Sequence, residues 1–295
     1  MTLLELFCDV DDFCQLFLHH AQALAGRELG TTKRGPRCRM ALSEVLTILI
    51  EFHRSSYRHF KAYYTQVVLG RWRDAFPDAV SYGRFVELMP SAVVPMLFYI
   101  QSLLGTSTGI AFIDSTALPV CHSLRIKSHR VFEGLAAVSK TSKGWYLGFK
   151  LHLLINERGE LLAFHLTAGN VDDRSPVPEM VEGIEGKLYG DKGYISQVLA
   201  EQLREGGLEL ITPLRKNMKP KMLHLFDKLM LRKRALIETV NDQLKNISQI
   251  CHTRHRSPQN FLANLLGGLI AYCFQPKKPS LSLVPSERGM LPAVI

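Results

Sequence analysis

The stretch "KLYGDKGYIS", residues 187–196, ends a short apolar run on Asp191 and continues with lysine, glycine and tyrosine. Asp and Gly are common turn residues, so Asp191 has an ordinary structural interpretation. A carboxylate at the end of a buried strand is also suited to binding a metal ion, provided that other ligands lie nearby. The two interpretations differ in whether the rest of the chain supplies such ligands.

The segments on either side of this stretch alternate between strand-like and helix-like patterns. Apolar runs predict five strands, at "GIAFIDST" (109–116), "WYLGFKLHLLIN" (145–156), "ELLAFHLTAG" (160–169), "GKLYGD" (186–191) and "LELITPL" (208–214). "SQVLAEQLREGG" (196–207) predicts a helix that ends at glycine. Three strands that meet as hairpins, followed by alternating helices and strands, indicate an α/β fold with a mixed sheet.

A second carboxylate, Asp114, closes the first of these strands as Asp191 closes the fourth. If the two strands are parallel neighbours, both carboxylates emerge at the same end of the sheet, where α/β folds usually place their sites. Two adjacent carboxylates repel each other unless a proton or a cation intervenes. Mg²⁺ suits such a pair, because it binds one or two carboxylates and accepts phosphate oxygens.

A third acid lies on the helix predicted for "LRKRALIETVNDQLKNIS" (231–248). An apolar stripe supports this helix and comprises Leu236, Val240, Leu244 and Ile247. At 100° per residue, Arg234, Glu238 and Lys245 share the opposite face. This face has two interpretations. One is a solvated surface with an Arg–Glu pair worth about 0.2–0.5 kcal/mol, and the other is a third metal ligand flanked by two phosphate-binding cations.

These acids and their surroundings resemble the bacterial insertion-sequence DDE transposases. Glu238 follows Asp191 by 47 residues, and in "RALIETVNDQLKN" an arginine precedes the glutamate by four residues and a lysine follows it by seven. The segments that resemble blocks of one subgroup of the family are "FIDST", "GFKLHLLIN", "LTAGNVDDRSPV", "LYGDKGYIS" and "HTRHRSPQNFLANLLGGLIAY". The resemblance covers most of residues 109–278. It departs from the broad family pattern at Leu231, where a tyrosine is usual.

The resemblance implies an RNase H-like mixed sheet flanked by helices and a DDE triad of Asp114, Asp191 and Glu238. It implies cleavage at the terminal inverted repeats of an insertion sequence and joining of the 3′-hydroxyl ends to target DNA. Two Mg²⁺ ions, for which Mn²⁺ can substitute, would assist the in-line displacement. Asp114 would contact both ions, and Asp191 and Glu238 would each contact mainly one. A homodimer on DNA is implied because the element has two ends.

The charge of the chain favours a polyanionic partner. Its formal net charge is +9, and residues 215–234 contain eight Lys or Arg against the single acid Asp227. This run predicts contacts with the phosphate backbone. For the basic segment 122–130, DNA contact and a solvated surface are equally supported interpretations. The predicted DNA-binding residues are Arg234, Lys245, Lys192, Arg215, Lys216, Lys219, Lys221, Arg232 and Lys233.

The sequence divides into three parts. Residues 1–105 are predicted to form an all-α domain for DNA binding or dimerisation, with a plain helical bundle as the alternative. Residues 106–275 are predicted to form the catalytic domain, and residues 276–295 a disordered tail. In the N-terminal part, Ser43 is the expected N-cap of a helix, and Pro90 and Pro95 are expected to interrupt another.

Composition limits the compartment and the class of protein. The six cysteines form no CxxC pair, and no run approaches 18 continuous apolar residues. These features predict a cytoplasmic, nucleoid-associated protein without a membrane partner. Two alternatives to a transposase remain: an RNase H-like nuclease without strand transfer, and a catalytically inactive DNA-binding relative. Asp172 and Asp173 are interpreted as turn residues in a loop.

Overall fold

The structure is a computed structural model that describes residues 1–28, 39–142, 144–215, 217–218, 222–251 and 255–281. Contacts divide the chain into two compact units. The first comprises Met1–Leu103 and Leu244–Pro276, and the second comprises Leu104–Gln243 with the described residues that follow Pro276. Of the tail predicted to be disordered, residues 282–295 lie outside the described residues.

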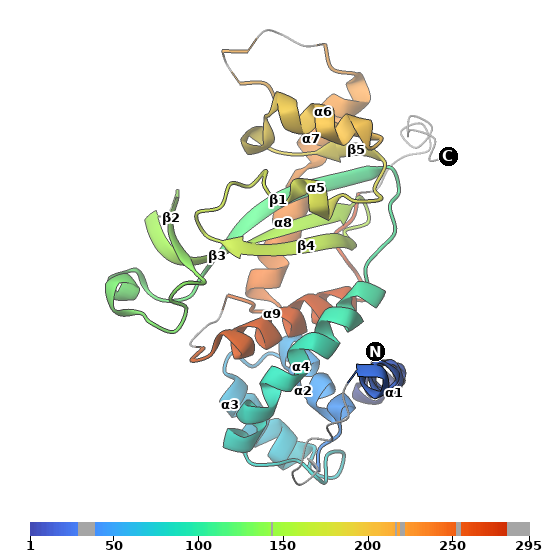
Figure 1. Cartoon of the computed structure of the whole chain (residues 1–295), viewed down its shortest axis with the longest axis vertical. Helices are drawn as coiled ribbons and strands as arrows, with labels where there is room; N and C mark the ends of the chain where they lie inside the picture. The colour runs from blue at the N-terminus through green and yellow to red at the C-terminus, as the bar shows by residue number, and fades with distance from the viewer. Residues whose placement is uncertain (29–38, 143, 216, 219–221, 252–254, 282–295) are drawn as a thin grey trace. The chain divides into compact units, whose positions relative to one another are not determined.

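The first unit is helical. Its elements are α1 (Leu3–Glu28), α2 (Leu42–Arg54), α3 (Phe60–Tyr63), the π-helix η1 (Tyr64–Arg71), α4 (Tyr82–Ser102) and α9 (Pro258–Cys273). Helix α9 packs against α2 and α4 (Figure 1). The sequence placed α9 in the catalytic domain, whereas its contacts place it with the N-terminal helices. Nearly all of its side chains from Phe261 to Tyr272 are buried, so it needs partners on several sides.

Helix α4 runs without interruption through Pro90 and Pro95, so the expected breaks are absent. Pro90 has no N–H to donate to the carbonyl of Val86, four residues earlier. Asn260 of α9 replaces that donor, because its Nδ2 lies 3.4 Å from the Val86 oxygen. By length and composition α4 is the one described helix suited to cross a membrane, and its buried face packs within the helical unit.

The start of α2 also differs from expectation. The helix begins at Leu42 with Ala41 at the N-cap, and Ser43 is buried inside the first turn, so the predicted cap at Ser43 is wrong. Glu44 compensates, since its Oε2 accepts a hydrogen bond from the Ala41 N–H at 2.7 Å. The carboxylate thus satisfies a backbone donor that a capping serine would leave free.

The second unit is built on a mixed sheet. Its strands are β1 (Ile110–Pro119), β2 (Ala137–Thr141), β3 (Gly144–Asn156), β4 (Leu161–Ala168), β5 (Gly186–Tyr189) and β6 (Leu208–Ile211). The order is β2-β3-β1-β5-β6, and β4 also pairs with β3, along the residues of β3 that pair with β1 on its opposite side. β1 is antiparallel to β3 and parallel to β5, as β5 is to β6. All five predicted strands are present, and β2 is an additional one.

Helices cover both faces of this sheet. They are η2 (Ser123–Ser128), α5 (Val177–Met180), η3 (Lys192–Tyr194), α6 (Gln197–Glu205), α7 (Leu225–Lys233) and α8 (Ala235–Asn246), whose last residues belong to the first unit. On one face, Ile113, Leu154 and Leu188 form an apolar core with α5 and α6. The other face contacts α7 and α8. The mixed α/β architecture with a helical N-terminal region confirms the predicted RNase H-like fold class.

Candidate active site

Asp114 and Asp191 lie at the same level of two neighbouring parallel strands. In the register of β1 and β5, Phe112 is paired with Tyr189, and each aspartate follows its strand's paired residue by two positions. Asp114 lies in the middle of β1, where it is paired with Leu153 of β3, so the expectation that it closes its strand is wrong. Asp191 follows the end of β5 by two residues. The two strands are parallel neighbours, which is the condition on which the pairing of the two carboxylates rested.

Asp114 is largely buried on the sheet face that contacts α8. Its side chain is 22% exposed, and its Oδ2 accepts a hydrogen bond from Nδ2 of Asn241 at 3.1 Å. Nη1 of Arg234 lies 4.0 Å from Oδ1. Burial raises the pKa of Asp114 to about 6, while Arg234 and the Ser115 N–H oppose the rise.

The three predicted acids are electrostatically coupled. The negative charges of Asp191 and Glu238 also raise the pKa of Asp114, because each disfavours a further charge nearby. Glu238 is 57% exposed on α8, and its Oε1 accepts a hydrogen bond from Nη2 of Arg234 at 2.6 Å. The Arg234 guanidinium therefore contacts both Glu238 and Asp114.

Asp191 has the turn role that its stretch allowed. Its Oδ1 accepts a hydrogen bond from the N–H of Gly193 at 2.7 Å and so caps the short helix η3. Its charge also acts on Asp114. The role of Asp191 as a metal ligand stays a prediction.

The donor chemistry of this cluster suits Mg²⁺, since it offers carboxylates and, on Asn241, a buried amide oxygen without a partner in the described part of the chain. Among the described residues, no three His, Cys, Asp or Glu side chains are close enough to hold a metal ion as they stand. The cation present beside these acids is the Arg234 guanidinium, which contacts both Asp114 and Glu238.

The predicted DNA-binding residues are only partly placed. Nη2 of Arg215 donates to the Lys192 carbonyl at 3.2 Å, so these two exposed cations lie beside the turn of Asp191. Arg232 is exposed and Lys233 half-buried on α7. Lys245 follows Glu238 on α8 but belongs to the first unit. Lys216, Lys219 and Lys221 lie outside the described residues.

A polar cluster behind Asp114 was not anticipated. Oδ1 of Asp173 accepts hydrogen bonds from Oγ of Ser115 and from Nζ of Lys150, both at 2.9 Å. Asp172 is a turn residue as predicted, accepting from the N–H and the guanidinium of Arg174. Asp173 instead ties its loop to β1, next to Asp114. The "VDDR" sequence gives no sign that its two acids differ.

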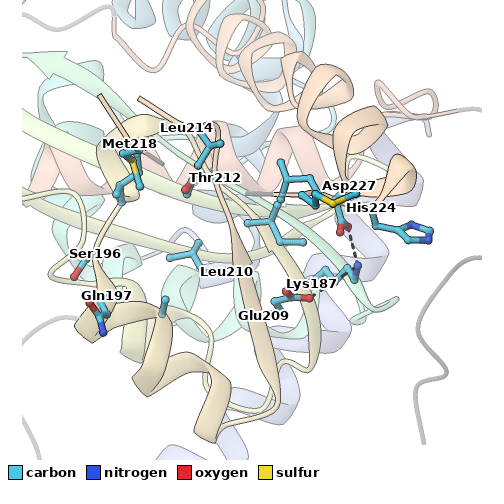
Figure 2. Close-up of a pocket in the computed structure, with 15 residues that line it drawn as sticks. Lys187, Ser196, Gln197, Glu209, Leu210, Thr212, Leu214, Met218, His224 and Asp227 are labelled. Carbon is cyan, nitrogen blue, oxygen red and sulfur yellow. Dashed lines mark hydrogen bonds and ion pairs between the residues drawn. The ribbon is translucent and has the colours of Figure 1, made fainter. Parts of the chain in front are cut away.

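A cavity of about 590 Å³ lies elsewhere, beside β6 (Figure 2). Lys187, Glu209 and Asp227 form its charged side, and α6 and the start of α7 contribute to its walls. None of the three candidate acids lines it. The cavity is therefore distinct from the acidic cluster.

We expect Asp114→Asn to stabilise the metal-free protein at neutral pH. A folded-state pKa of about 6, above the ordinary 3.8, means that the ionised carboxylate opposes folding at higher pH. The penalty is nearly absent near pH 4, grows between pH 4 and 6, and reaches about 3 kcal/mol above pH 6.

Urea denaturation in EDTA at pH 4 and pH 7.5 measures this effect. Asp114→Asn should match the wild type at pH 4 and exceed its free energy of unfolding at pH 7.5. Equal stability at pH 7.5 would contradict the raised pKa. Histidines that titrate in this range are common to both proteins and cancel in the comparison.

Comparison with known proteins identifies the family of the chain. A family model described as "Transposase DDE domain" matches residues 104–258. No curated protein sequence is significantly similar to the chain.

Two solved structures are distantly similar. A piggyBac transposase synaptic complex with hairpin DNA is 13% identical, with a TM-score of 0.38 over 75% of this chain and 50% of that one. A Mos1 transposase paired-end complex with the left transposon end is 12% identical, with a TM-score of 0.25 over 80% and 78%. The chain thus spans half the length of the piggyBac chain.

Proposed function

The chain belongs to the transposase DDE domain family, and we propose that it cuts DNA at the terminal inverted repeats of a bacterial insertion sequence and joins the 3′-hydroxyl ends to target DNA. The observation that carries the proposal is the placement of Asp114 and Asp191 at one level of two parallel strands, with the charge of Glu238 on α8 acting on Asp114. Phosphoryl transfer needs acids placed in this way, because little covalent chemistry is left to the protein.

Asp114, Asp191 and Glu238 would hold divalent ions, Mg²⁺ or Mn²⁺. Two such ions would supply a deprotonated water or 3′-hydroxyl as nucleophile and stabilise the leaving oxygen. Asp114 would serve both ions, since it feels the charge of the other two acids. Arg234 would exchange its contacts with the acids for contacts with DNA phosphate.

Basic residues around the acids would position the DNA backbone. Arg215 and Lys192 are joined to each other beside Asp191 and can contact a phosphate near the cleaved bond. The remaining predicted contacts are Arg232, Lys233, Lys245, Lys216, Lys219 and Lys221. The basic net charge of the chain supports binding that depends strongly on salt.

The proposal includes the assembly and the compartment. An element has two ends, so two copies of the chain would act together on DNA. The helical unit would recognise the repeats or join the two copies. The protein would work in the cytoplasm, associated with nucleoid DNA.

Cleavage of labelled duplexes that carry the inverted repeats flanking the gene tests the function. Nicking at the repeat ends is expected with Mg²⁺ or Mn²⁺ and not with EDTA. Transfer of the labelled 3′ ends to a plasmid would separate a transposase from a nuclease without strand transfer. Binding without any cleavage would favour the inactive relative.

We expect the double change Lys192→Gln with Arg215→Gln to weaken DNA binding by about tenfold or more at physiological salt. Each phosphate contact contributes roughly 0.9 to the slope of log K against log salt, so the slope should fall by about two. Fluorescence anisotropy over a salt series measures both quantities.

Arg204→Gln is the matched control for this pair. Arg204 is an exposed arginine in the last turn of α6, at the opposite end of that helix from the turn of Asp191. Its loss should leave the slope unchanged. If both variants reduce the slope equally, the cations near Asp191 have no special place in DNA binding.

A further inference from the structure

Asn241 lies on the same face of α8 as Glu238, which it follows by three residues and from which it is turned by about 60° around the helix. Arg234, the other charged residue beside Asp114, stands in the turn between α7 and α8. Unlike Glu238, Asn241 is buried, with only 7% of its surface exposed. The polar atoms of a buried amide are normally hydrogen-bonded, so an unpaired one calls for an explanation.

The two polar atoms of the Asn241 amide are in opposite situations. Nδ2 donates a hydrogen bond to Oδ2 of Asp114 at 3.1 Å. Oδ1 is buried and has no hydrogen-bond partner among the described residues. An acceptor left in this state costs about 1–3 kcal/mol, so an apolar side chain would serve packing better.

The contact with Asp114 separates this atom from other unpartnered acceptors of α8. Oε1 of Gln243, two residues later, is also buried without a partner, but no hydrogen bond joins that side chain to an acid of the site. In the described part of the chain, Asn241 is the residue that combines a buried free oxygen with a hydrogen bond to Asp114. Its position therefore points to a ligand bound at that carboxylate.

The orientation of the amide is the one expected while no cation lies between the two residues. Two oxygens facing each other would repel, so the N–H group faces Asp114. A half-turn of the terminal amide exchanges nitrogen and oxygen without moving the rest of the side chain. A divalent cation at Asp114 would favour the turned form, because amide oxygens are ligands for Mg²⁺ and Ca²⁺ while amide nitrogens are not.

We propose that Asn241 supplies a fourth oxygen donor, beside Asp114, Asp191 and Glu238, to the divalent cation of the cleavage site. The inference rests on the proposed function, since that function is what places a cation among these acids. The oxygen acts either on the ion or on a water bound to it. In both cases Asn241 sets how firmly the ion is held next to Asp114.

Binding of Mn²⁺ alone, measured by electron paramagnetic resonance on the DNA-free protein, tests the inference without any cleavage. Asn241→Leu keeps the branched shape of the side chain and removes both polar atoms, and Asn241→Asp keeps an oxygen in place. We expect the Mn²⁺ dissociation constant to rise about tenfold or more in Asn241→Leu. Asn241→Asp should bind at least as tightly as the wild type, because a carboxylate is the stronger ligand.

Thr239→Ala is the control, because Thr239 is exposed on α8 and bonds only to its own helix. It should bind Mn²⁺ as the wild type does. Circular dichroism and melting temperature show whether Asn241→Leu is folded. If Asn241→Leu does not fold, Mn²⁺ binding by Asn241→Asp still tests the inference.

Three outcomes would overturn the inference: no Mn²⁺ binding by the wild type, unchanged binding by Asn241→Leu, or binding by Asn241→Asp as weak as that of Asn241→Leu. The proposed function is tested by a separate measurement, which is cleavage of the repeat ends by the wild type. A wild type that binds Mn²⁺ through Asn241 but does not cleave its repeats would contradict the function and leave the inference standing.

Discussion

Asp191→Asn should reduce Mg²⁺-dependent nicking of the repeat ends by about 10³-fold or more, which corresponds to at least roughly 4 kcal/mol of transition-state stabilisation. The substitution removes a negative charge and one metal-binding oxygen from the strand end. It retains an amide oxygen that can still accept the Gly193 N–H, so the cap of η3 is preserved. The expected loss is therefore one of chemistry, not of folding. Single-turnover cleavage of labelled DNA measures it.

Affinity for the same DNA distinguishes a catalytic role from a binding role. It should be unchanged or slightly higher in Asp191→Asn, because the variant has one negative charge fewer near the phosphates. Asp172→Asn is the matched control, since Asp172 is an aspartate in a loop and pairs with Arg174. It should cleave at nearly the wild-type rate.

Two results would change the interpretation. Equal cleavage by the wild type and Asp191→Asn would remove Asp191 from the chemistry. Absence of cleavage by the wild type, with DNA binding intact, would favour a binding-only relative or a missing assembly partner.

The pairing of the two aspartates could be predicted because it depends on local patterns. Short apolar runs at Asp114 and Asp191 mark the strands β1 and β5, although β1 continues past Asp114 to Pro119. The α/β pattern then allowed the two strands to be parallel neighbours. The place of Glu238 beside Asp114 could not be predicted from helix periodicity, which also allowed a solvated ion pair. Both descriptions hold in part, because Glu238 is exposed and pairs with Arg234 while its charge still acts on Asp114.

The other features depend on contacts between distant segments, which no local pattern encodes. Asn241 resembles any polar residue on a helix until Asp114, 127 residues away in sequence, accepts its hydrogen bond. Helix α4 passes Pro90 because Asn260 supplies a donor from another helix. Asp173 differs from Asp172 only through Ser115 and Lys150. In each case the hydrogen-bond partner of a polar group comes from a segment distant in sequence. Patterns in the sequence predict only partners that are close along the chain.

The buried ion pair between Lys187 and Asp227 should be essential for the stability of the second unit. Nζ of Lys187 lies 2.7 Å from Oδ1 of Asp227 (Figure 2). The Tyr189 hydroxyl donates to the same oxygen at 2.9 Å. Asp227 is 8% exposed, so its charge has little access to water. Lys187→Met would leave that charge without its cation. We expect the free energy of unfolding in urea to fall by about 3–5 kcal/mol.

A double substitution separates the effect of an unpaired Asp227 charge from the effect of lost packing around Lys187. Lys187→Met combined with Asp227→Leu removes both charges and should recover most of the stability, because a buried pair can often be replaced by apolar groups at small cost. Lys228→Met, at an exposed lysine next to Asp227 on α7, should change stability by no more than about 0.5 kcal/mol. A loss below about 1 kcal/mol in Lys187→Met would mean that water screens the pair. Lys187 lies on β5, which precedes Asp191, and Asp227 lies in the first turn of α7. A large loss would therefore mean that this ion pair holds α7, with its basic residues, against β5.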